Sequence, residues 1–401
     1  MTIDNLTIED WSLLGALCAL FIAQVYWYAR YMCAPARKIR KDAKLKANSQ
    51  QLKANSRQPG VSVVLCAHNE GDNLAHYLQA LLTQDYPTYE VIVVNDGSED
   101  DTQEVIERYM QHDPRLRYTF VPRDARVGST KKLALTLAAK AAQYDYLLLI
   151  DADCRPESTR WISEMMEGFS QHSTFNTQHS TDIVLGFGAY FYEKGHVNRL
   201  MRYDTLFNGL HYLGAALCGH PYMGVGRNLA YRKQLFFESG GFSRLMTNRA
   251  GDDDLFVNHV ATRENTAVVL SRDSMTWSPS KTHLRDWWLQ KRRHVSVSPS
   301  YKGITKFRLA IEPVTRGLFY ALVLYMAIGY WPLAVGGWNI PFMVAVGLFL
   351  IRWLMQTIVL NVSARRMGLH RFGMFTVLWF DIVLPLVNLW MLAVPRKKLK
   401  W

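Results

Sequence analysis

Residues 146–153 read Tyr-Leu-Leu-Leu-Ile-Asp-Ala-Asp, an apolar run that ends in two acidic residues. A short continuous apolar run is typical of a strand buried on both faces, as in the parallel sheet of an α/β protein. Asp151 and Asp153 come just after the run, and strand alternation would point both side chains the same way if the chain stayed extended. The stretch therefore predicts a buried strand that carries two carboxylates to one edge of a sheet.

Upstream of this strand, short β-branched runs alternate with helical patterns. We expect strands at residues 61–66, 90–95 and, more weakly, 118–121, with helices at residues 73–82, 102–110 and 131–142. Strands that alternate with helices predict a parallel sheet joined by right-handed crossovers. The chain is therefore expected to contain an α/β domain with a mostly parallel sheet.

Polar residues follow three of the four expected strands. Asn69 and Glu70 come after the first strand, Asp96 after the second, and Asp151 with Asp153 after the fourth. In open α/β sheets, ligands bind outside the carboxyl ends of the strands. Asp96 could accept a hydrogen bond there from a base or a ribose. This edge of the sheet is the predicted binding site.

Two interpretations of Asp151 and Asp153 stay open from the residues alone. Paired carboxylates suit Mg²⁺ or Mn²⁺, which prefer oxygen ligands and share them with substrate phosphates. An acidic turn or a helix N-cap is the alternative, and Asp153 ahead of Pro156 could provide such a cap.

Two further segments place functional residue types at the start of an expected helix. Gly128-Ser-Thr-Lys-Lys132 offers a helix N-terminus to a phosphate, although it lacks the spacing of a P-loop. Gly251-Asp-Asp-Asp-Leu-Phe256 places three carboxylates in a row, which repel one another unless a helix N-terminus or a function stabilises them. A helix cap explains one of these carboxylates, and a general base that removes a hydroxyl proton would explain another.

Apolar residues gather at the two ends of the 401-residue chain. Residues 11–31 are long enough to span a bilayer, with acidic residues before them and basic residues after them, the reverse of a signal peptide. The net charge is +12, and these basic residues lie beside the apolar ends: Arg37, Lys38, Arg40, Lys41, Lys44, Lys46, Arg396, Lys397, Lys398 and Lys400. Such flanks favour an anionic membrane surface, rather than nucleic acid, as the partner.

Three further apolar segments follow near the C-terminus, at residues 314–335, 340–362 and 372–394. The last contains Asp381, Pro385 and Asn388, which are costly in lipid or disturb a helix. A full fourth span would also carry the basic tail outside, against the positive-inside rule. We therefore expect three full spans, a cytoplasmic C-terminus, and a last segment that is broken, re-entrant or interfacial, with four spans as the alternative.

Trp287 and Trp288 lie beside Lys291, Arg292 and Arg293. Tryptophans at headgroup level with cations near lipid phosphate are typical of an interfacial helix. An ordinary helix that packs its tryptophans into the core is the alternative. An interfacial helix here would bring the predicted binding edge close to the bilayer.

Five motifs, in order, resemble those of the inverting family 2 glycosyltransferases. They are Val63-Val-Leu-Cys-Ala-His-Asn-Glu70, Val93-Val-Asn-Asp-Gly-Ser98, Lys131-Lys-Leu-Ala-Leu-Thr136, Asp151-Ala-Asp153, and Gly226-Arg-Asn-Leu-Ala-Tyr-Arg232 with Gly240-Gly-Phe242. The resemblance implies a GT-A fold, which is Rossmann-like, and a Mg²⁺ or Mn²⁺ ion held by Asp151 and Asp153. It also implies donor contacts from Asn69, Glu70, Asp96, Lys131 and Asp151.

The general-base motif of this family is usually Glu-Asp-x-Asp-Leu. Its Asp-Leu aligns with Asp254-Leu255, so the resemblance implies that Asp252 is the catalytic base. Gly251 stands where the glutamate is common, and this departure leaves Asp253 as a rival.

The processive members of the family carry Gln-x-x-Arg-Trp. Here Gln290 and Arg293 are retained, whereas His294 replaces the tryptophan. The resemblance implies that Gln290 and Arg293 contact the diphosphate or the acceptor, and the replacement weakens the case for processive synthesis.

The expected organisation is a transmembrane anchor (1–36), a basic linker (37–60), a GT-A domain (61–300) and a C-terminal membrane domain (301–401). The resemblance implies a hexosyl- or N-acetylhexosaminyl-transferase that moves a sugar, with inversion, from a nucleotide-sugar donor to a lipid-linked or growing glycan acceptor. It implies a multi-pass protein of the plasma (inner) membrane with a cytoplasmic catalytic domain. A processive polysaccharide synthase and a catalytically silent nucleotide-sugar-binding subunit of an export complex are the alternatives.

Overall fold

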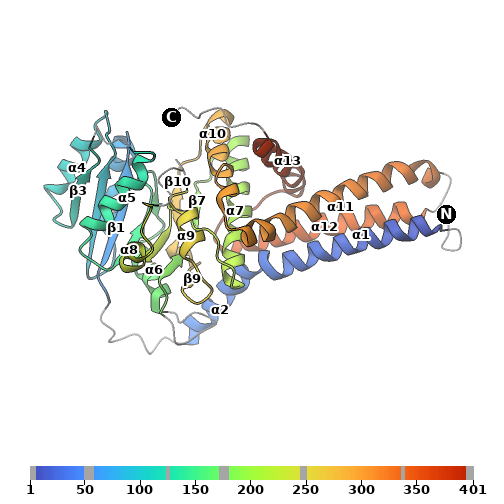
Figure 1. Cartoon of the computed structure of the whole chain (residues 1–401), viewed down its shortest axis with the longest axis horizontal. Coiled ribbons are helices and arrows are strands. Elements are labelled where there is room, and N and C mark those ends of the chain that lie inside the picture. Colours follow the sequence, from blue (N-terminus) through green and yellow to red (C-terminus); the bar gives the residue numbers. More distant parts are fainter. Residues whose placement is uncertain are drawn as a thin grey trace. The chain divides into compact units, whose positions relative to one another are not determined.

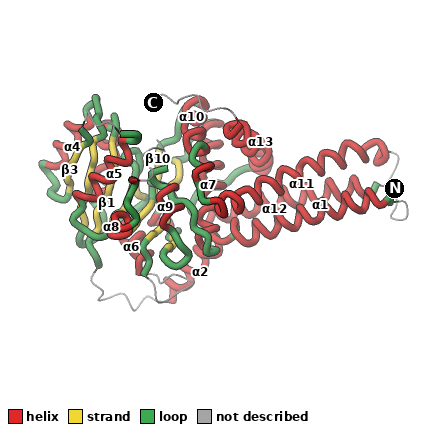
Figure 2. The backbone as a smooth tube through the Cα atoms, in the orientation of Figure 1, coloured by secondary structure: helices red, strands yellow, loops and turns green. Residues whose placement is uncertain are grey.

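The computed structural model describes residues 6–48, 58–122, 127–170, 180–243, 251–335 and 339–393. The chain divides into two compact units. One contains residues 35–301, and the other combines residues 1–34 with residues 302–401. Figure 1 follows the chain through both units, and Figure 2 shows that the described strands all belong to the first unit.

A seven-stranded sheet forms the centre of the unit of residues 35–301, in the order β3-β2-β1-β4-β8-β6-β9. The four predicted strands are parallel neighbours: β1 (Val61–Ala67), β2 (Tyr89–Asn95), β3 (Leu116–Phe120) and β4 (Tyr146–Leu149). Three short strands extend the sheet beyond β4: β8 (Leu229–Arg232), which is antiparallel to β4 and β6, then β6 (Ile183–Leu185) and β9 (Thr266–Val268). The expected mostly parallel α/β sheet is therefore confirmed.

The three helices predicted between the strands are present as α3 (Gly71–Leu82), α4 (Thr102–Met110) and α5 (Thr130–Ala141). The unit also contains α6 (Trp161–Ser170), α7 (His196–Leu217), α8 (Lys233–Glu238), α9 (Asp254–Val260) and α10 (Leu284–Val295), with 3₁₀ turns at Arg272–Ser274 and Ser298–Ser300. The described part of the basic segment forms α2 (Ala34–Asn48).

A small second sheet, in the order β5-β10-β7, packs beside the large one and consists of β5 (Arg155–Pro156), β10 (Thr276–Ser278) and β7 (Gly188–Tyr190). Buried Asn228 joins the two sheets: its Nδ2 donates to Phe187 O (3.0 Å) and Ser274 O (2.7 Å), and its Oδ1 accepts from Trp161 Nε1 (3.1 Å). A buried side-chain amide without hydrogen-bond partners destabilises the fold, so these bonds are favoured. They hold the start of β8 next to the starts of β7 and β10.

The second unit is helical. It contains α1 (Ile8–Trp27), a π-helical turn (Tyr28–Met32), α11 (Gly303–Val335), α12 (Ile340–Arg366) and α13 (Met374–Ala393). Leu14 and Leu17 of α1 pack with Phe319 and Met326 of α11 and Ala345 of α12. Within the described residues, four helices are long and apolar enough to cross a membrane.

Buried charged residues connect α11, α12 and α13. The Asp381 carboxylate on α13 accepts hydrogen bonds from Arg316 Nη1, Arg352 Nη1 and Gln356 Nε2, each at 2.7 Å, and from the Tyr320 hydroxyl. Arg352 and Asp381 are almost completely buried. Because an unpaired charge is expensive in lipid, these partners explain how an aspartate is tolerated here.

Two more residues extend this polar cluster. Arg352 Nη2 also donates to Gln24 Oε1 on α1 (3.1 Å), and Arg316 Nη2 forms an ion pair with Glu312 (3.1 Å). All four helices of the unit therefore contribute to one polar cluster, formed by Gln24, Glu312, Arg316, Tyr320, Arg352, Gln356 and Asp381.

The expectation that the last apolar segment is broken is wrong, because α13 is one uninterrupted helix with Pro385 inside it. Figure 1 shows α1, α11 and α12 side by side along one direction, whereas α13 is turned away from that direction. Since α13 too is long and apolar enough to cross a membrane, the three-span topology stays a prediction. The basic tail, residues 396–400, lies outside the described residues.

The interfacial interpretation of α10 is wrong for Trp287 and Lys291, which both face the protein. Trp287 is only 5% exposed. Lys291 Nζ pairs with both carboxylate oxygens of Asp204 on α7, at 2.7 and 2.8 Å. The alternative, a helix that packs into the core, describes these side chains.

Candidate active site

Two loops meet where β1 and β2 end. Asn69, which has a φ of 56°, donates its backbone N–H to Ser98 Oγ (3.0 Å) and accepts the Glu99 N–H on Oδ1 (2.8 Å). Asparagine tolerates this left-handed conformation better than most residues. The contacts of Asn69 thus join the two loops, and its predicted donor contact stays a prediction.

Asp96 is fixed at the end of β2 by its backbone. Its N–H donates to Ala67 O (2.7 Å), and its carbonyl oxygen contacts His68 Nδ1 (2.6 Å). The side chain is half-buried. Among the described residues no hydrogen bond is made by the Asp96 carboxylate, so it is held in place and remains available to a ligand.

Glu70 directly precedes α3, and its predicted donor contact stays a prediction. Its Oε2 accepts from Asn73 Nδ2 (2.5 Å), and its backbone N–H donates to Thr102 Oγ1 (2.9 Å). Burial raises the pKa of Glu70 above its ordinary value, and the charges of Asp153 and Asp151 add to the rise.

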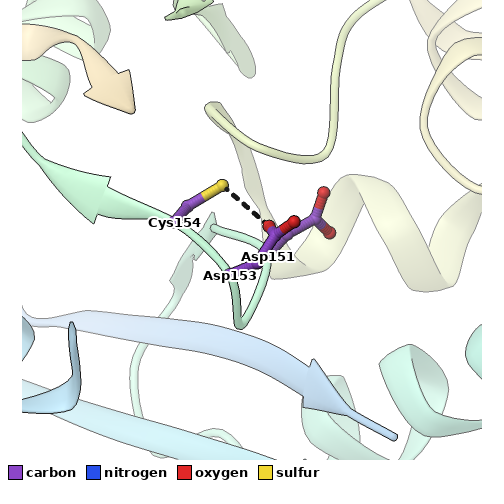
Figure 3. Close-up of side chains that lie close together, drawn as sticks. All are labelled: Asp151, Asp153 and Cys154. Carbon is purple, nitrogen blue, oxygen red and sulfur yellow. Dashed lines mark hydrogen bonds between the residues drawn. The ribbon is translucent and has the colours of Figure 1, made fainter. Parts of the chain in front are cut away.

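The two predicted metal carboxylates come together through a turn. β4 ends at Leu149, and Cys154 N donates to Asp151 O (3.0 Å) to close the turn. Figure 3 shows the side chains of Asp151, Asp153 and Cys154 close together at this turn. One ligand atom from each residue lies within 4.8 Å of the others. The chain does not stay extended past Asp151, so the condition for the predicted alignment is not met. Of the two alternatives, the acidic turn is present, whereas Asp153 caps no helix because strand β5 follows.

The chemistry of this group fits a hard cation such as Mg²⁺ or Mn²⁺. Asp151 and Asp153 offer carboxylate oxygens, and burial together with the charge of Asp151 raises the pKa of Asp153. Burial raises the pKa of the Cys154 thiol, which donates to Asp153 Oδ1 (3.3 Å) and contacts Ser278 Oγ (3.0 Å). A protonated thiol is a poor metal ligand, so the oxygens would hold the ion.

Lys131, at the start of α5, connects the two acidic segments. Its Nζ lies 3.1 Å from Asp151 Oδ1 and 3.1 Å from Asp252 Oδ2. Partial burial disfavours its charge, but Asp151 and Asp252 outweigh this effect, so the pKa of Lys131 lies well above its ordinary value. The three predicted site residues therefore lie in one place, although they are far apart in sequence.

Asp252 and Asp253, in the acidic run before α9, make different contacts. Both carboxylate oxygens of Asp253 accept backbone N–H groups, Oδ2 from Gly226 (2.7 Å) and Oδ1 from Asp254 (2.8 Å). Asp253 is thus the helix cap, and burial with the charge of Asp252 raises its pKa to about 6. Partial burial opposes ionisation of Asp252, but Lys131 outweighs it and holds the pKa of Asp252 below its ordinary value.

Gln290 and Arg293 lie one turn apart on α10. Gln290 Nε2 donates to the Tyr190 hydroxyl (3.1 Å), and Tyr190 stacks under the Arg227 guanidinium, whose carbon lies 4.5 Å from the ring centre. Gln290 is therefore connected to Arg227 through Tyr190, and its predicted donor contact stays a prediction. Arg293 is half-buried, and its contact with a donor stays a prediction.

Two residues of the site were not predicted. Arg227 belongs to a motif noted in the sequence, but nothing there showed that it lies near Asp153 and Asp151. The Tyr301 hydroxyl donates to Asp254 Oδ2 (3.1 Å), and no sequence pattern connects positions that far apart. Both contacts depend on tertiary packing.

Comparison with known proteins finds similarity to one family model, to curated relatives and to a solved structure. The family model described as Glycosyl transferase family 2 matches residues 62–237. A poly-beta-1,6-N-acetyl-D-glucosamine synthase from Staphylococcus epidermidis is 35% identical over 94 residues, which is 23% of this chain and 22% of that protein. Its counterpart from Staphylococcus aureus is 34% identical over 94 residues, with the same shares. The matches thus span less than a quarter of these relatives.

A solved structure extends the similarity to the whole fold. The mannosyltransferase PcManGT from Pyrobaculum calidifontis, in complex with GDP-Man and Mn²⁺, has a TM-score of 0.51 and 16% identity. The similarity covers 92% of this chain and 99% of that one, and it confirms the expected GT-A fold. Residues 62–237 of this chain therefore form a glycosyl transferase family 2 domain.

Proposed function

We propose that this protein is an inverting glycosyltransferase that moves a sugar from a nucleotide-sugar donor to a membrane-associated acceptor. One observation carries the proposal: the Lys131 ammonium group lies 3.1 Å from a carboxylate oxygen of Asp151 and 3.1 Å from one of Asp252. Asp151 is the proposed metal ligand and Asp252 the proposed base, so both groups lie beside the same lysine. A transferase with inversion needs both groups close to the reacting carbon, one beside the leaving diphosphate and one beside the acceptor hydroxyl.

Asp252 acts as the general base in this proposal. Its pKa is lowered, so it is ionised at neutral pH and can accept the acceptor proton. Asp253, the rival from the sequence, already accepts two backbone N–H groups and serves as a helix cap. The geometry therefore supports Asp252 as the base.

The donor lies along the strand-end edge. Asp96 binds the base or ribose, and Asn69, Glu70, Lys131, Gln290 and Arg293 complete the donor contacts. Asp151 and Asp153 would hold a Mg²⁺ or Mn²⁺ ion, which neutralises charge on the leaving nucleoside diphosphate when bound. The similar mannosyltransferase structure, which contains Mn²⁺ and a nucleotide sugar, supports this assignment.

The acceptor is a lipid-linked or growing glycan, and the protein resides in the plasma (inner) membrane with its catalytic domain in the cytoplasm. Four apolar helices support the membrane assignment. The synthase relatives support a cell-envelope polysaccharide and an N-acetylhexosaminyl donor. A processive polysaccharide synthase is the second candidate function, favoured by the names of the same relatives.

The test is donor turnover by the purified full-length chain. UDP- and GDP-linked hexoses and N-acetylhexosamines are supplied with membrane lipid extract and with Mg²⁺ or Mn²⁺, and release of nucleoside diphosphate is measured. We expect one donor to be turned over and EDTA to stop the reaction. A product of many sugars would identify the processive synthase. If every donor stays intact, the protein is a silent binding subunit instead.

A further inference from the structure

Arg227 follows the glycine that lies between the two acidic segments of the site. Its neighbour Gly226 donates its N–H to Asp253 Oδ2 (2.7 Å). A Cβ placed on Gly226 would be 3.5 Å from that oxygen and 3.9 Å from Asp151 Oδ1. The backbone that leads into Arg227 therefore passes directly beside the carboxylates on which the proposed function depends.

The small sheet holds the Arg227 side chain in one position. Thr276 Oγ1 donates to Arg227 O (2.9 Å), and the Tyr190 ring lies under the guanidinium at 4.5 Å. The side chain also crosses Gly188 closely, because a Cβ there would be 3.1 Å from Arg227 Cβ and 3.4 Å from Nε. Gln290 fixes the Tyr190 hydroxyl in turn. These contacts order the guanidinium before any ligand arrives.

Most of the hydrogen-bonding capacity of Arg227 is unused. A guanidinium carries five N–H donors, and within the described residues Ser278 Oγ is the one acceptor it reaches, at 3.2 Å. No ion pair joins Arg227 to a carboxylate in the described part of the chain, whereas Lys131 is occupied by two. An ordered, half-buried arginine with spare donors suits a phosphate, which it binds through two parallel hydrogen bonds.

We propose that Arg227 binds the diphosphate of the donor and holds the nucleoside diphosphate as it leaves, an inference that rests on the proposed function. In that reaction the bond between the anomeric carbon and the diphosphate oxygen breaks, and its electron pair stays on the diphosphate. The acceptor oxygen forms the new bond to the anomeric carbon and passes its proton to Asp252. Arg227 acts on the charge that grows on the leaving oxygen. Tyr190 is a positioning residue for Arg227.

The experiment measures binding of UDP, GDP, uridine and guanosine to the full-length protein by calorimetry with Mg²⁺. Arg227→Ala is expected to weaken the preferred nucleoside diphosphate by about 10–100-fold, the usual worth of charged hydrogen bonds, and to leave the matching nucleoside unchanged. Arg227→Lys should recover only part of this loss, because a lysine cannot make the two parallel bonds.

Arg232→Ala is the matched control. Arg232 stacks on Tyr146 at 4.9 Å, but Tyr146 begins β4, so this arginine lies at the opposite end of the strand from Asp151. Its removal should not change diphosphate affinity, and melting temperatures check that each variant folds. If wild type and Arg227→Ala bind the diphosphate with equal affinity, the proposed role of Arg227 is overturned, whereas the proposed function still stands. If the wild type binds neither diphosphate, the proposed function fails and this inference fails with it.

Discussion

Replacing Asp381 by alanine is expected to destabilise the helical unit by about 4–6 kcal/mol. The carboxylate accepts from Arg316 and Arg352 at 2.7 Å, and both partners are almost fully buried. Removing one member of a buried ion pair costs about 3–5 kcal/mol because a charge is left unpaired. Gln356 and Tyr320 lose an acceptor as well, which adds about 1 kcal/mol at the values typical of membrane proteins.

The assay is the free energy of unfolding of the full chain in mixed micelles, measured by titration with SDS. Asp10→Ala is a matched control in the same unit, since Asp10 is also a buried carboxylate but accepts from Thr7, in a capping box, and from the Tyr330 hydroxyl rather than from a buried cation. We expect it to cost about 1 kcal/mol, as lost caps usually do.

A double variant separates the unpaired charge from lost packing. Asp381→Leu with Arg352→Leu removes one charge of each sign and leaves Arg316 paired with Glu312 at 3.1 Å. It should cost less than Asp381→Ala alone, because apolar pairs replace buried ion pairs at little loss. The reasoning is refuted if Asp381→Ala is as mild as Asp10→Ala, or if the double variant is the less stable of the two.

Three further outcomes are expected. Asp153→Ala should abolish transfer and its dependence on Mg²⁺ or Mn²⁺ while the melting temperature is kept, and activity that survives in EDTA would remove the metal from the account. Tyr301→Phe should lower kcat several-fold with KM unchanged, because it removes the hydrogen bond that the Tyr301 hydroxyl donates to Asp254. An unchanged kcat would mean that this hydrogen bond does not position the acidic segment that contains Asp252. Because the pKa of Asp253 is raised from 3.8 to about 6, the folded chain keeps a proton that the unfolded chain releases. Stability should therefore fall as pH rises between these values, and Asp253→Asn should flatten that slope in melting curves.

The parallel half of the large sheet was predictable because its strands are long apolar runs between clear helical patterns. β1, β2 and β4 bury almost every side chain, and only that pattern was needed to find them. β6 and β9 have three residues each, too few to show a period, and their positions depend on pairing with β8 rather than on local preference.

The site was predictable where strand ends determine it and not where packing does. Asp96 follows β2 and Asp151 follows β4, and both strands pair in parallel with β1, so the two residues had to lie at the same edge of the sheet. The orientation of α10 was misjudged because tryptophan beside lysine suits a membrane surface and a protein core equally well. What decides it is Asp204, a partner on another helix 87 residues away.

Turnover by Asp252→Asn tests most directly the central claim, that Asp252 is the general base. The substitution keeps the shape of the side chain and removes its basicity, and general base catalysis contributes roughly 10²–10⁴-fold. We predict that transfer to the acceptor falls by at least 100-fold, with affinity for the nucleoside diphosphate unchanged and with Asp253→Asn less affected. Near wild-type transfer by Asp252→Asn would contradict the account, as would loss of transfer confined to Asp253→Asn.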